Sequence, residues 1–304
     1  MIPKTLFSRF ISTQARLKSF RTFLEQNRDK RALRVIEAHS GLSALIAERA
    51  SHGENKFDAL WSSSLTSSTI KGKPDIEVVD LTQRLSIVAD CMESSSLPVV
   101  FDGDTGGSAE IFFFTVRTLE RNGVSAVVIE DKTGLKQNSL YGTERKQVLE
   151  DVDVFSAKLR RGKEAQIGDE FMIFARIEAL IAGLGVEEAL NRATRYVVDG
   201  KADGILIHSK EKTGEDVFEF MRKFRVDFPR IPVIAVPTTY NGLTEEQLFA
   251  QGIDIVIYAN QLLRAAYPAM ADACQTILKN GRSKELDQSI MNIKDIINLI
   301  PQSV

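Results

Sequence analysis

Short apolar runs recur along the chain, separated by longer segments in which apolar and polar residues alternate with a helical period. Eight runs can be counted, and they begin at Leu33, Phe57, Leu97, Ser125, Phe171, Asp203, Ile231 and Asp254. Each is about four to six residues long, rich in Val and Ile, and free of the polar alternation of a half-exposed strand. This pattern is typical of parallel strands that are buried on both faces.

Helix-length segments lie between these runs. Three examples are residues 78–92, residues 109–123, which end at Gly123, and residues 186–200, which end at Gly200. A glycine is a common end signal for a helix. Because an open sheet of eight parallel strands is rarer, eight alternating units predict an α/β fold of the (β/α)₈ TIM-barrel type. We expect an N-terminal helical extension over residues 1–30 and one barrel domain over residues 31–304, which includes the C-terminal helices.

Composition and charge narrow the functional classes. The chain has 304 residues, is 43% apolar and 26% charged, and carries 39 basic against 41 acidic residues. A net charge of -2 offers no strong field for nucleic acid, so we expect no nucleic-acid partner. The apolar runs are shorter than the roughly 18 residues that a membrane span requires, so no membrane partner is expected either. No GxGxxG fingerprint follows the first strand, which argues against dinucleotide binding.

The two cysteines and the basic N-terminus bear on location. Cys91 and Cys274 lie in predicted helices without metal or redox spacing, which predicts two buried thiols in a reducing, cytoplasmic compartment. The first 24 residues contain five basic residues and no acid. This pattern faintly resembles an organelle transit peptide, but an amphipathic helix explains it equally well and is our preferred interpretation.

Polar residues close the predicted strands, where the active site of such a barrel lies. Asp102, Asp104 and Glu130 follow the third and fourth strands, which are neighbours, so their carboxylates can converge. Converging carboxylates repel one another unless a cation or a proton lies among them, and an all-oxygen ligand set favours Mg²⁺. The alternative is that the first two form a turn and Glu130 pairs with Lys132.

Two further strand ends carry residues that suit an anionic ligand. Arg176 offers a planar fork for a carboxylate or a phosphate, although pairing with Glu178 is an equal alternative. His208 could donate to an anion, although a lone histidine in a barrel is often structural.

Two loops complete the candidate site. The loop after the second strand contains small residues whose N–H groups could bind an oxyanion, namely Ser63 and Ser64, with Leu65 after them. The loop after Glu130 could close on a phosphorus-containing anion through Lys136, Asn138 and Ser139. A mobile polar lid is the more cautious interpretation of the second loop.

Several segments together resemble a known family. They are WSSSLT from Trp61, FDGDTGG from Phe101, EDKTGLKQNSL from Glu130, ARIEALIAG from Ala175, HSK from His208 and VPTTY from Val236. These segments resemble the phosphoenolpyruvate mutases of the isocitrate lyase and phosphoenolpyruvate mutase superfamily, and the resemblance extends from about Leu33 to the C-terminus. It implies a phosphomutase that interconverts phosphoenolpyruvate and phosphonopyruvate with Mg²⁺.

The resemblance also implies a role for each site residue. Asp102 matches a direct Mg²⁺ ligand, and Asp104 and Glu130 match ligands that act through water. The carboxylate of the substrate would bind at residues 63–65, with Trp61 as a wall of the pocket. The phosphonyl group would bind at Arg176, His208, Asn138 and Ser139, and Lys136 matches the lid lysine. Asp75 matches the aspartate beside the transferring phosphorus, either as a nucleophile or, as we prefer, as a group that steers the transfer.

Alternatives remain within this superfamily. A phosphonopyruvate hydrolase would share the barrel, the metal ligands and the substrate, and Asn138 in KQNSL favours the mutase over it. A carbon–carbon lyase would need a lid cysteine, which this sequence lacks. Gly103 and Gly107 depart from the alanine and the aromatic residue that many members carry, so the pocket floor could differ. A barrel that only binds or assembles would not explain the whole residue set.

The resemblance further implies a homodimer or homotetramer in which the last helix swaps between subunits. An apolar stripe in the tail suits such burial, although packing on the same barrel would produce the same pattern; it comprises Ile290, Ile293, Ile296, Ile297 and Ile300. The phosphonate pathway does not follow from the sequence.

Overall fold

The computed structural model describes residues 12–134, 136, 139 and 148–300. Its strands are β1 (Leu33–Glu37), β2 (Ala59–Ser62), β3 (Val99–Asp102), β4 (Ala126–Glu130), β5 (Met172–Ile177), β6 (Gly204–Ile207), β7 (Val233–Ala235) and β8 (Ile255–Tyr258). Its helices are α1 (Thr13–Asn27), α2 (Gly41–Arg49), α3 (Ser64–Ile70), α4 (Leu81–Ser94), α5 (Ala109–Arg121), α6 (Val152–Ala165), α7 (Gly185–Val198), α8 (Glu215–Asp227), α9 (Glu245–Ala250), α10 (Gln261–Asn280) and α11 (Ile293–Ile297), with a short 3₁₀ helix, Lys284–Leu286.

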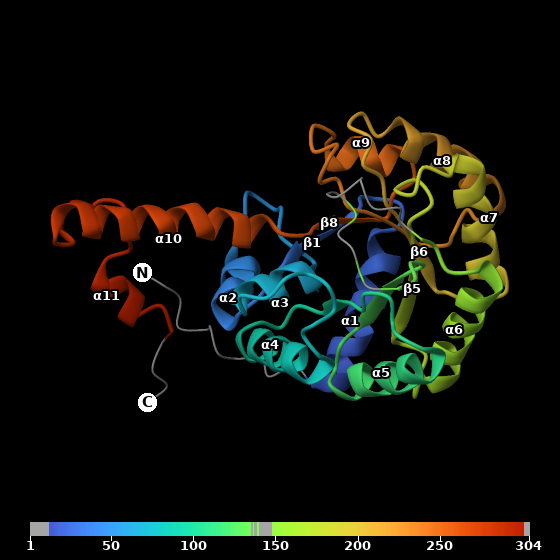
Figure 1. The fold of residues 1–304 in the computed structure, drawn as a ribbon, viewed down its shortest axis with the longest axis horizontal. Coiled ribbons are helices and arrows are strands. Elements are labelled where there is room, and N and C mark those ends of the chain that lie inside the picture. The colour runs from blue at the N-terminus through green and yellow to red at the C-terminus, as the bar shows by residue number, and fades with distance from the viewer. Residues whose placement is uncertain (1–11, 135, 137–138, 140–147, 301–304) are drawn as a thin grey trace. The chain divides into compact units, whose positions relative to one another are not determined.

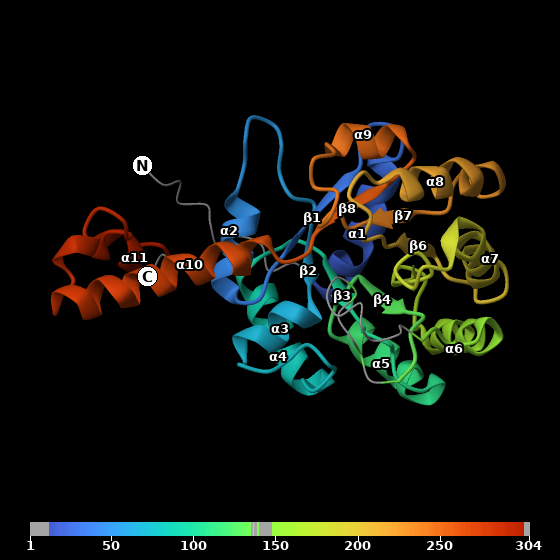
Figure 2. The same cartoon turned by 45° about the horizontal axis from the view of Figure 1, so that its top comes forward.

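The eight strands pair in sequence order and close into a parallel barrel. Each strand pairs with the next, and β8 pairs with β1 through Leu33 opposite Ile255. Helices follow one another around the outside of these strands, as α5, α6, α7 and α8 show (Figures 1 and 2). The predicted (β/α)₈ fold and all eight predicted strands are therefore confirmed.

Alternate residues of each strand point into the barrel and form one apolar cluster. Val35, Val100, Val128, Phe174 and Leu206 belong to it and are nearly inaccessible to solvent. Side chains alternate between the two faces of a strand, so each next inward position lies two residues further along the chain. The packed interior thus leads directly to the residues at the carboxyl ends of the strands.

Helix α1 covers the opposite end of the barrel. Its Phe20 and Leu24 join the inner cluster. The guanidinium of Arg16 donates to the carbonyls of Leu97 at 2.6 Å and Ser95 at 2.9 Å, just before β3. The amphipathic helix predicted near the N-terminus is therefore present in the described part, residues 13–27.

Contacts within the chain define a first compact unit that extends to Asn260 and a second that begins at Gln261. The predicted division at residues 30 and 31 stays a prediction. Cys91 is buried as predicted, but Cys274 is exposed, and that part of the prediction is wrong. The reason is that helix α10, which carries Cys274, has no buried side chain. Among the described residues, no helix combines the length and the apolarity that crossing a membrane would require.

Gly162 marks a close contact between helices α6 and α5 in the barrel wall. A Cβ at this position of α6 would lie 2.8 Å from Cδ1 of Phe112 and 3.1 Å from Cδ1 of Ile173, and closer still to Cε1 of Phe112. Phe112 is fully buried, so its ring cannot move aside. Packing of α6 against α5 therefore depends on the missing side chain.

We predict that Gly162→Ala destabilises the protein although alanine favours helix formation. The gain in helix propensity is about 1 kcal/mol, and overpacking costs up to about 3 kcal/mol, so we expect the free energy of unfolding in urea to fall by up to about 2 kcal/mol. Gly242→Ala is the matched control, because a Cβ there meets nothing within 4 Å. Equal stability of the two variants would contradict the packing argument.

Candidate active site

A ring of polar residues continues the inward face of the barrel strands. On four strands a polar residue lies two positions after an inward apolar residue. The pairs are Val100 and Asp102, Val128 and Glu130, Phe174 and Arg176, and Leu206 and His208. The same step beyond Val35 and Trp61 leads to Glu37 and Ser63. Because these side chains follow the apolar core layers at the carboxyl ends of the strands, they meet at one barrel mouth.

A cavity at this mouth is lined by most of the predicted site residues. They are Trp61, Ser63, Ser64, Leu65, Asp75, Asp102, Lys136, Ser139, Arg176 and His208, together with Leu206, Val236, Thr238, Ala259 and Asn260. Asp104 and Glu130 do not line the cavity but contact residues that do. Asn138 lies outside the described residues.

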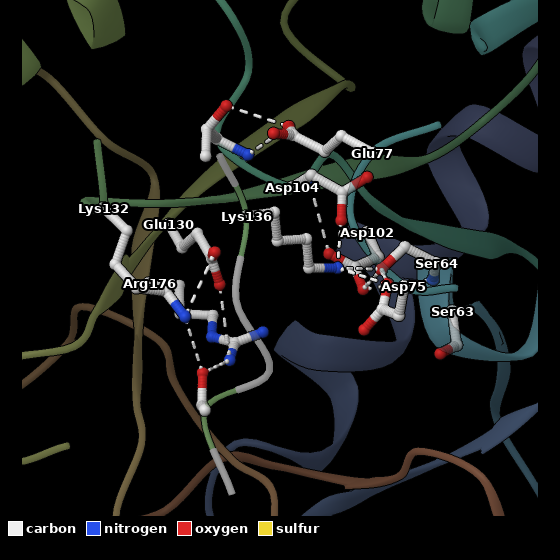
Figure 3. A network of polar contacts seen from close by, with 12 residues as sticks. Ser63, Ser64, Asp75, Glu77, Asp102, Asp104, Glu130, Lys132, Lys136 and Arg176 are labelled. Atoms are coloured by element: carbon white, nitrogen blue, oxygen red, sulfur yellow. Dashed lines mark hydrogen bonds and ion pairs between the residues drawn. The ribbon is translucent and has the colours of Figure 1, made fainter. Parts of the chain in front are cut away.

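The ammonium group of Lys136 joins three polar groups from different segments (Figure 3). It donates to the Asp75 carboxylate at 2.9 Å, and it also forms an ion pair with Asp104 and a hydrogen bond with Ser64. The hydroxyl of Ser64 in turn donates to Asp102 at 2.9 Å. Lys136 is only 5% exposed. The lid lysine, the loop aspartate and the carboxylates after β3 therefore form one buried cluster.

Arg84 holds Asp104 from the other side. Its guanidinium donates to the Asp104 carboxylate at 3.0 Å and to the carbonyl of Ser62 at 3.0 Å. It also stacks 4.0 Å from the centre of the Phe101 ring. Asp104 is thus fixed by two cations, and its backbone adopts a left-handed conformation with φ 53°.

A second group of charges forms around β4 and β5, where Glu130 and Arg176 are register partners. Arg176 Nη2 lies 3.4 Å from a Glu130 oxygen, and Lys132 Nζ lies 3.3 Å from the other. Arg176 also donates to Glu178 at 2.5 Å. The ion pairs weighed as alternatives, Glu130 with Lys132 and Arg176 with Glu178, are therefore both present.

His208 and Ser139 complete this second group. Nδ1 of His208 lies 2.8 Å from a Glu178 oxygen and 3.0 Å from Arg176 Nη2. The hydroxyl of Ser139 donates to the Glu178 carboxylate at 2.7 Å and accepts from Arg176 at 2.9 Å. Two predicted anion-binding residues and a lid serine therefore share Glu178, a residue that the sequence indicated only as a partner of Arg176.

Asp131 supports Glu178 from below the mouth. This fully buried carboxylate accepts from the Tyr196 hydroxyl at 2.7 Å, from Arg192 at 3.0 Å and from the backbone N–H of Glu178 at 2.9 Å. These bonds tie the end of β4 to the end of β5 and to α7. Asp131 therefore supports the site without facing the cavity.

Neighbouring charges keep the buried Asp102 deprotonated and the buried Lys136 protonated. Burial alone would raise the pKa of Asp102, but Lys136 and Arg84 lower it to about 2. Burial alone would lower the pKa of Lys136, but Asp104 and Asp102 raise it above its usual range. Both groups are therefore charged at neutral pH.

Glu130 and His208 respond differently. Burial raises the pKa of Glu130 to about 7, although Arg176 and Lys132 oppose the shift. Burial also lowers the pKa of His208, although Glu178 opposes this. The imidazole is therefore neutral at pH 7, and Glu130 titrates close to that pH.

The oxygen donors expected for Mg²⁺ are present, but cations lie beside them. In the described part of the chain, no three His, Cys, Asp or Glu residues approach closely enough to hold an ion together. Asp104 contacts Lys136 and Arg84, whereas Glu130 lies beside Arg176 and Lys132. Each oxygen of Glu130 faces one of these cations, at 3.3 Å and 3.4 Å, and accepts no hydrogen bond among the described residues. The donor set fits a hard cation.

Gly103 explains one departure from the family pattern. A Cβ at this position would lie 2.8 Å from methyl groups of both Val127 and Ile129 and 3.0 Å from the Val128 carbonyl. The side chains of β4 thus leave no room for the alanine that many superfamily members have between the two aspartates.

Several contributors to the site were missed in the sequence. Leu206 and Val236 line the cavity, but as apolar core residues they carried no chemical signal. Arg84 could have been recognised in the sequence, because it shares the buried face of α4 with the apolar residues Ile87, Val88 and Cys91. A charged residue on an apolar helix face needs a buried partner, and that partner is Asp104.

Comparisons with known proteins agree with this barrel and its mouth. The model of the phosphoenolpyruvate phosphomutase family matches residues 20–278. The phosphonopyruvate hydrolase of Variovorax sp. (strain Pal2) is 35% identical over 271 residues, which cover 88% of this chain and 90% of that protein.

Two solved structures are also similar. The phosphoenolpyruvate phosphomutase of Streptomyces platensis subsp. rosaceus has a TM-score of 0.85 and 36% identity, with 93% of this chain and 94% of that chain covered. A phosphonopyruvate hydrolase in complex with oxalate and Mg²⁺ has a TM-score of 0.82 and 32% identity, with the same coverage.

The closed (β/α)₈ barrel and the relatives of this chain define a TIM-barrel enzyme. The chain belongs to the phosphoenolpyruvate phosphomutase family. Mutases and hydrolases are both among its similar proteins, so family membership alone leaves the reaction open.

Glu130 should make stability depend on pH in metal-free buffer. Because its pKa rises from 4.5 to about 7 in the folded state, folded protein holds this proton more tightly than unfolded protein does. The contribution of Glu130 to stability therefore falls as pH rises through this window, by on the order of 3 kcal/mol. Glu130→Gln has no proton to lose at this position. In urea titrations with EDTA, the unfolding free energy of the variant should therefore rise relative to that of wild type as the pH increases from 5 to 8. A difference that does not change with pH would contradict the assignment.

Proposed function

We propose that this protein interconverts phosphoenolpyruvate and phosphonopyruvate by a Mg²⁺-dependent intramolecular phosphoryl transfer. The observation that supports this most is the division of charge around the cavity. Asp75 and Asp102 line the cavity beside Lys136, and the cationic Arg176 lines it apart from them (Figure 3). Such a cavity suits a substrate that binds to a cation at one end and presents a phosphorus-containing anion at the other.

Arg176 would bind the phosphonyl group of phosphonopyruvate. Its side chain is 15% exposed, and Glu178 and Ser139 fix its orientation at the cavity wall. With Nε donating to Glu178 and Nη2 to Ser139, the guanidinium would donate to a phosphonyl oxygen through Nη1. His208, neutral and beside Arg176, would donate one further hydrogen bond from Nε2, in the tautomer whose Nδ1 accepts from Arg176. We also assign Ser139 and Asn138 to this group, Asn138 by family resemblance.

The carboxylate of the substrate would bind just after β2, where Ser63 caps helix α3 and Ser64 and Leu65 begin it, in place of the predicted loop. Ser63, Ser64 and Leu65 line the cavity there, and Trp61 forms part of its wall. Ser64 already donates to Asp102 through both its backbone N–H and its hydroxyl. The binding loop and the proposed metal ligand are thus linked directly.

Asp102, Asp104 and Glu130 would hold the Mg²⁺ ion, which stabilises the negative charge of the pyruvate enolate when bound. The all-oxygen donor set supports this role, and among the described residues the Glu130 oxygens form ion pairs but accept no hydrogen bond. A similar structure, that of a phosphonopyruvate hydrolase, is a complex with Mg²⁺ and oxalate.

Asp75 and Lys136 would guide the phosphorus between its two positions. Lys136 is protonated and joins Asp75 to Asp104, so closing of its loop brings a positive charge next to the metal ligands. Phosphoryl transfer needs positioning and charge neutralisation more than covalent chemistry. We therefore assign steering of the transferring group, rather than covalent attack, to Asp75.

Hydrolysis of phosphonopyruvate is the second candidate, because a hydrolase is 35% identical to this chain. Asn138 in the KQNSL segment supports the mutase, since an amide at this place could hold the phosphoryl group against the enolate oxygen and keep water away. A carbon–carbon lyase would need a thiol acid, but burial raises the pKa of Cys91 to about 12, and neither cysteine lines the cavity.

We also propose that the chain works as a homodimer or homotetramer in which the C-terminal helices pack on a partner chain. Helix α10 has no buried side chain, and Tyr267, Met270 and Leu278 are each more than half exposed. Such apolar exposure is typical of a protein interface. Light scattering would show a mass of two or four chains.

We predict that phosphonopyruvate incubated with the protein and Mg²⁺ yields phosphoenolpyruvate. Phosphorus NMR resolves the substrate, phosphoenolpyruvate and inorganic phosphate in one spectrum, so it separates transfer to the enolate from transfer to water. The expected result is a phosphoenolpyruvate signal that rises as phosphonopyruvate falls, without matching inorganic phosphate.

Asp102→Asn is the matched control for that experiment. The amide keeps an acceptor for Ser64 but loses the charge that the metal needs, so turnover should stop while the variant remains folded. If wild type forms one inorganic phosphate for each phosphonopyruvate consumed, and no phosphoenolpyruvate, the protein is a hydrolase and not a mutase. Full activity of Asp102→Asn would remove the metal site from the proposal.

A further inference from the structure

The loop that carries Asp75 lacks regular secondary structure. It connects the end of α3 at Ile70 with the start of α4 at Leu81. The Asp75 side chain itself contacts Lys136 and Ser64. Lys136 belongs to the segment after β4, and Ser64 is the first residue of α3. A further contact joins the loop of Asp75 to the segment that follows β3.

Glu77 provides this contact. One oxygen of its carboxylate accepts hydrogen bonds from the backbone N–H of Thr105 at 2.9 Å and from the Thr105 hydroxyl at 2.8 Å. Thr105 directly follows Asp104 in the chain. The loop of Asp75 is thereby joined to the loop of the proposed metal ligands (Figure 3).

Thr105 is a firm anchor for this contact. It is 8% exposed, and its carbonyl accepts a hydrogen bond from the buried ammonium of Lys158 on α6 at 3.1 Å. Lys158 in turn lies 5.5 Å from the centre of the Phe155 ring and 3.6 Å from Glu150. Glu77 therefore binds to a point that the barrel wall already holds.

The backbone at Glu77 is strained, as it is at Asp104. Glu77 has φ 60° and Asp104 has φ 53°, and among the described non-glycine residues only Lys201, also with φ 60°, shares this left-handed conformation. A residue with a Cβ adopts it at a cost in conformational energy, and such strain concentrates where surrounding contacts enforce it. The two strained residues lie on the two loops that Glu77 and Thr105 join.

We propose that Glu77 is a positioning residue that fixes Asp75 relative to the metal-binding carboxylates by binding Thr105. The inference rests on the proposed function and extends it to a residue outside the cavity lining. Asp75 lies two residues away, so a shift of the Glu77 backbone moves the aspartate relative to the substrate. Glu77 itself does not line the cavity and takes no part in bond making.

The test compares three substitutions at Glu77. Glu77→Gln keeps an oxygen acceptor of the same reach and should retain near-wild-type turnover of phosphonopyruvate. Glu77→Ala and Glu77→Gly lose the acceptor and should lower kcat by about 10- to 100-fold, the scale expected when a reacting group is misplaced. KM should change by less than about threefold, because the carboxylate-binding loop is untouched.

Lys201→Gly is the matched control for backbone strain. Lys201 is exposed and precedes β6, at the end of the barrel away from the cavity. In both glycine variants the residue with positive φ becomes glycine, which adopts this conformation without strain. The melting temperature of each variant should therefore equal or exceed that of wild type. Only Glu77→Gly should lose turnover. Equal kcat values for Glu77→Gly, Lys201→Gly and wild type would overturn the proposal, as would a Glu77→Gln variant as slow as Glu77→Ala.

Hydrogen exchange in metal-free buffer provides a readout that does not depend on the reaction. The Thr105 N–H and the peptide that covers residues 71–80 should exchange faster in Glu77→Ala than in wild type, and Glu77→Gln should restore protection. If wild type does not convert phosphonopyruvate, the proposed function fails while this exchange pattern still decides the positioning role. Unchanged exchange in Glu77→Ala would overturn that role even in an active enzyme.

Discussion

The mouth of this barrel depends on charge compensation between carboxylates on neighbouring strand ends and cations that reach them from other segments. Asp102 and Glu130 follow apolar core residues directly, so they lie where water has little access. Charged groups in such a place need partners. Lys136 and Arg84 supply them around the end of β3, and Arg176 and Lys132 supply them around the end of β4. Every proposed role at the site follows from this balance.

The balance also includes two residues of the loop after β4. Lys136 comes from the loop after β4 and contacts Asp75 and Asp104 together, whereas Ser139 of the same loop contacts Arg176 and Glu178. The two described residues of the lid thus reach the two charge groups separately. A divalent ion and an anionic substrate would enter between them, and the cationic side chains of the chain would then face the added negative charge of the substrate. Asp131 and Glu77, which face away from the cavity, support the strand end and the loop on which these groups lie.

Much of this arrangement could be predicted from the sequence because its signals are local. Eight Val- and Ile-rich runs predicted the strands, and the polar residues that close these runs, such as Arg176, were predicted to reach the mouth. Contacts made over long distances in sequence could not be predicted in this way. The bond from Glu77 to Thr105 spans 28 positions, and the neighbourhood of neither residue indicates the other. Asp75 was identified by family resemblance alone, and Cys274 was placed wrongly because the burial of a helix depends on what packs against it.

The central claim is that the carboxylates after β3 and β4 form a magnesium site once the ion and a pyruvate-like anion are present together. A crystal structure of the protein soaked with Mg²⁺ and oxalate, an analogue of the pyruvate enolate, tests it most directly. The account predicts one octahedral ion bound to Asp102, with Asp104 and Glu130 in its surroundings and with oxalate between the ion and the loop of Ser63 and Ser64. A mouth without the ion, in which Lys136 keeps its ion pair with Asp104 and the carboxylates face away from the oxalate, would contradict the account.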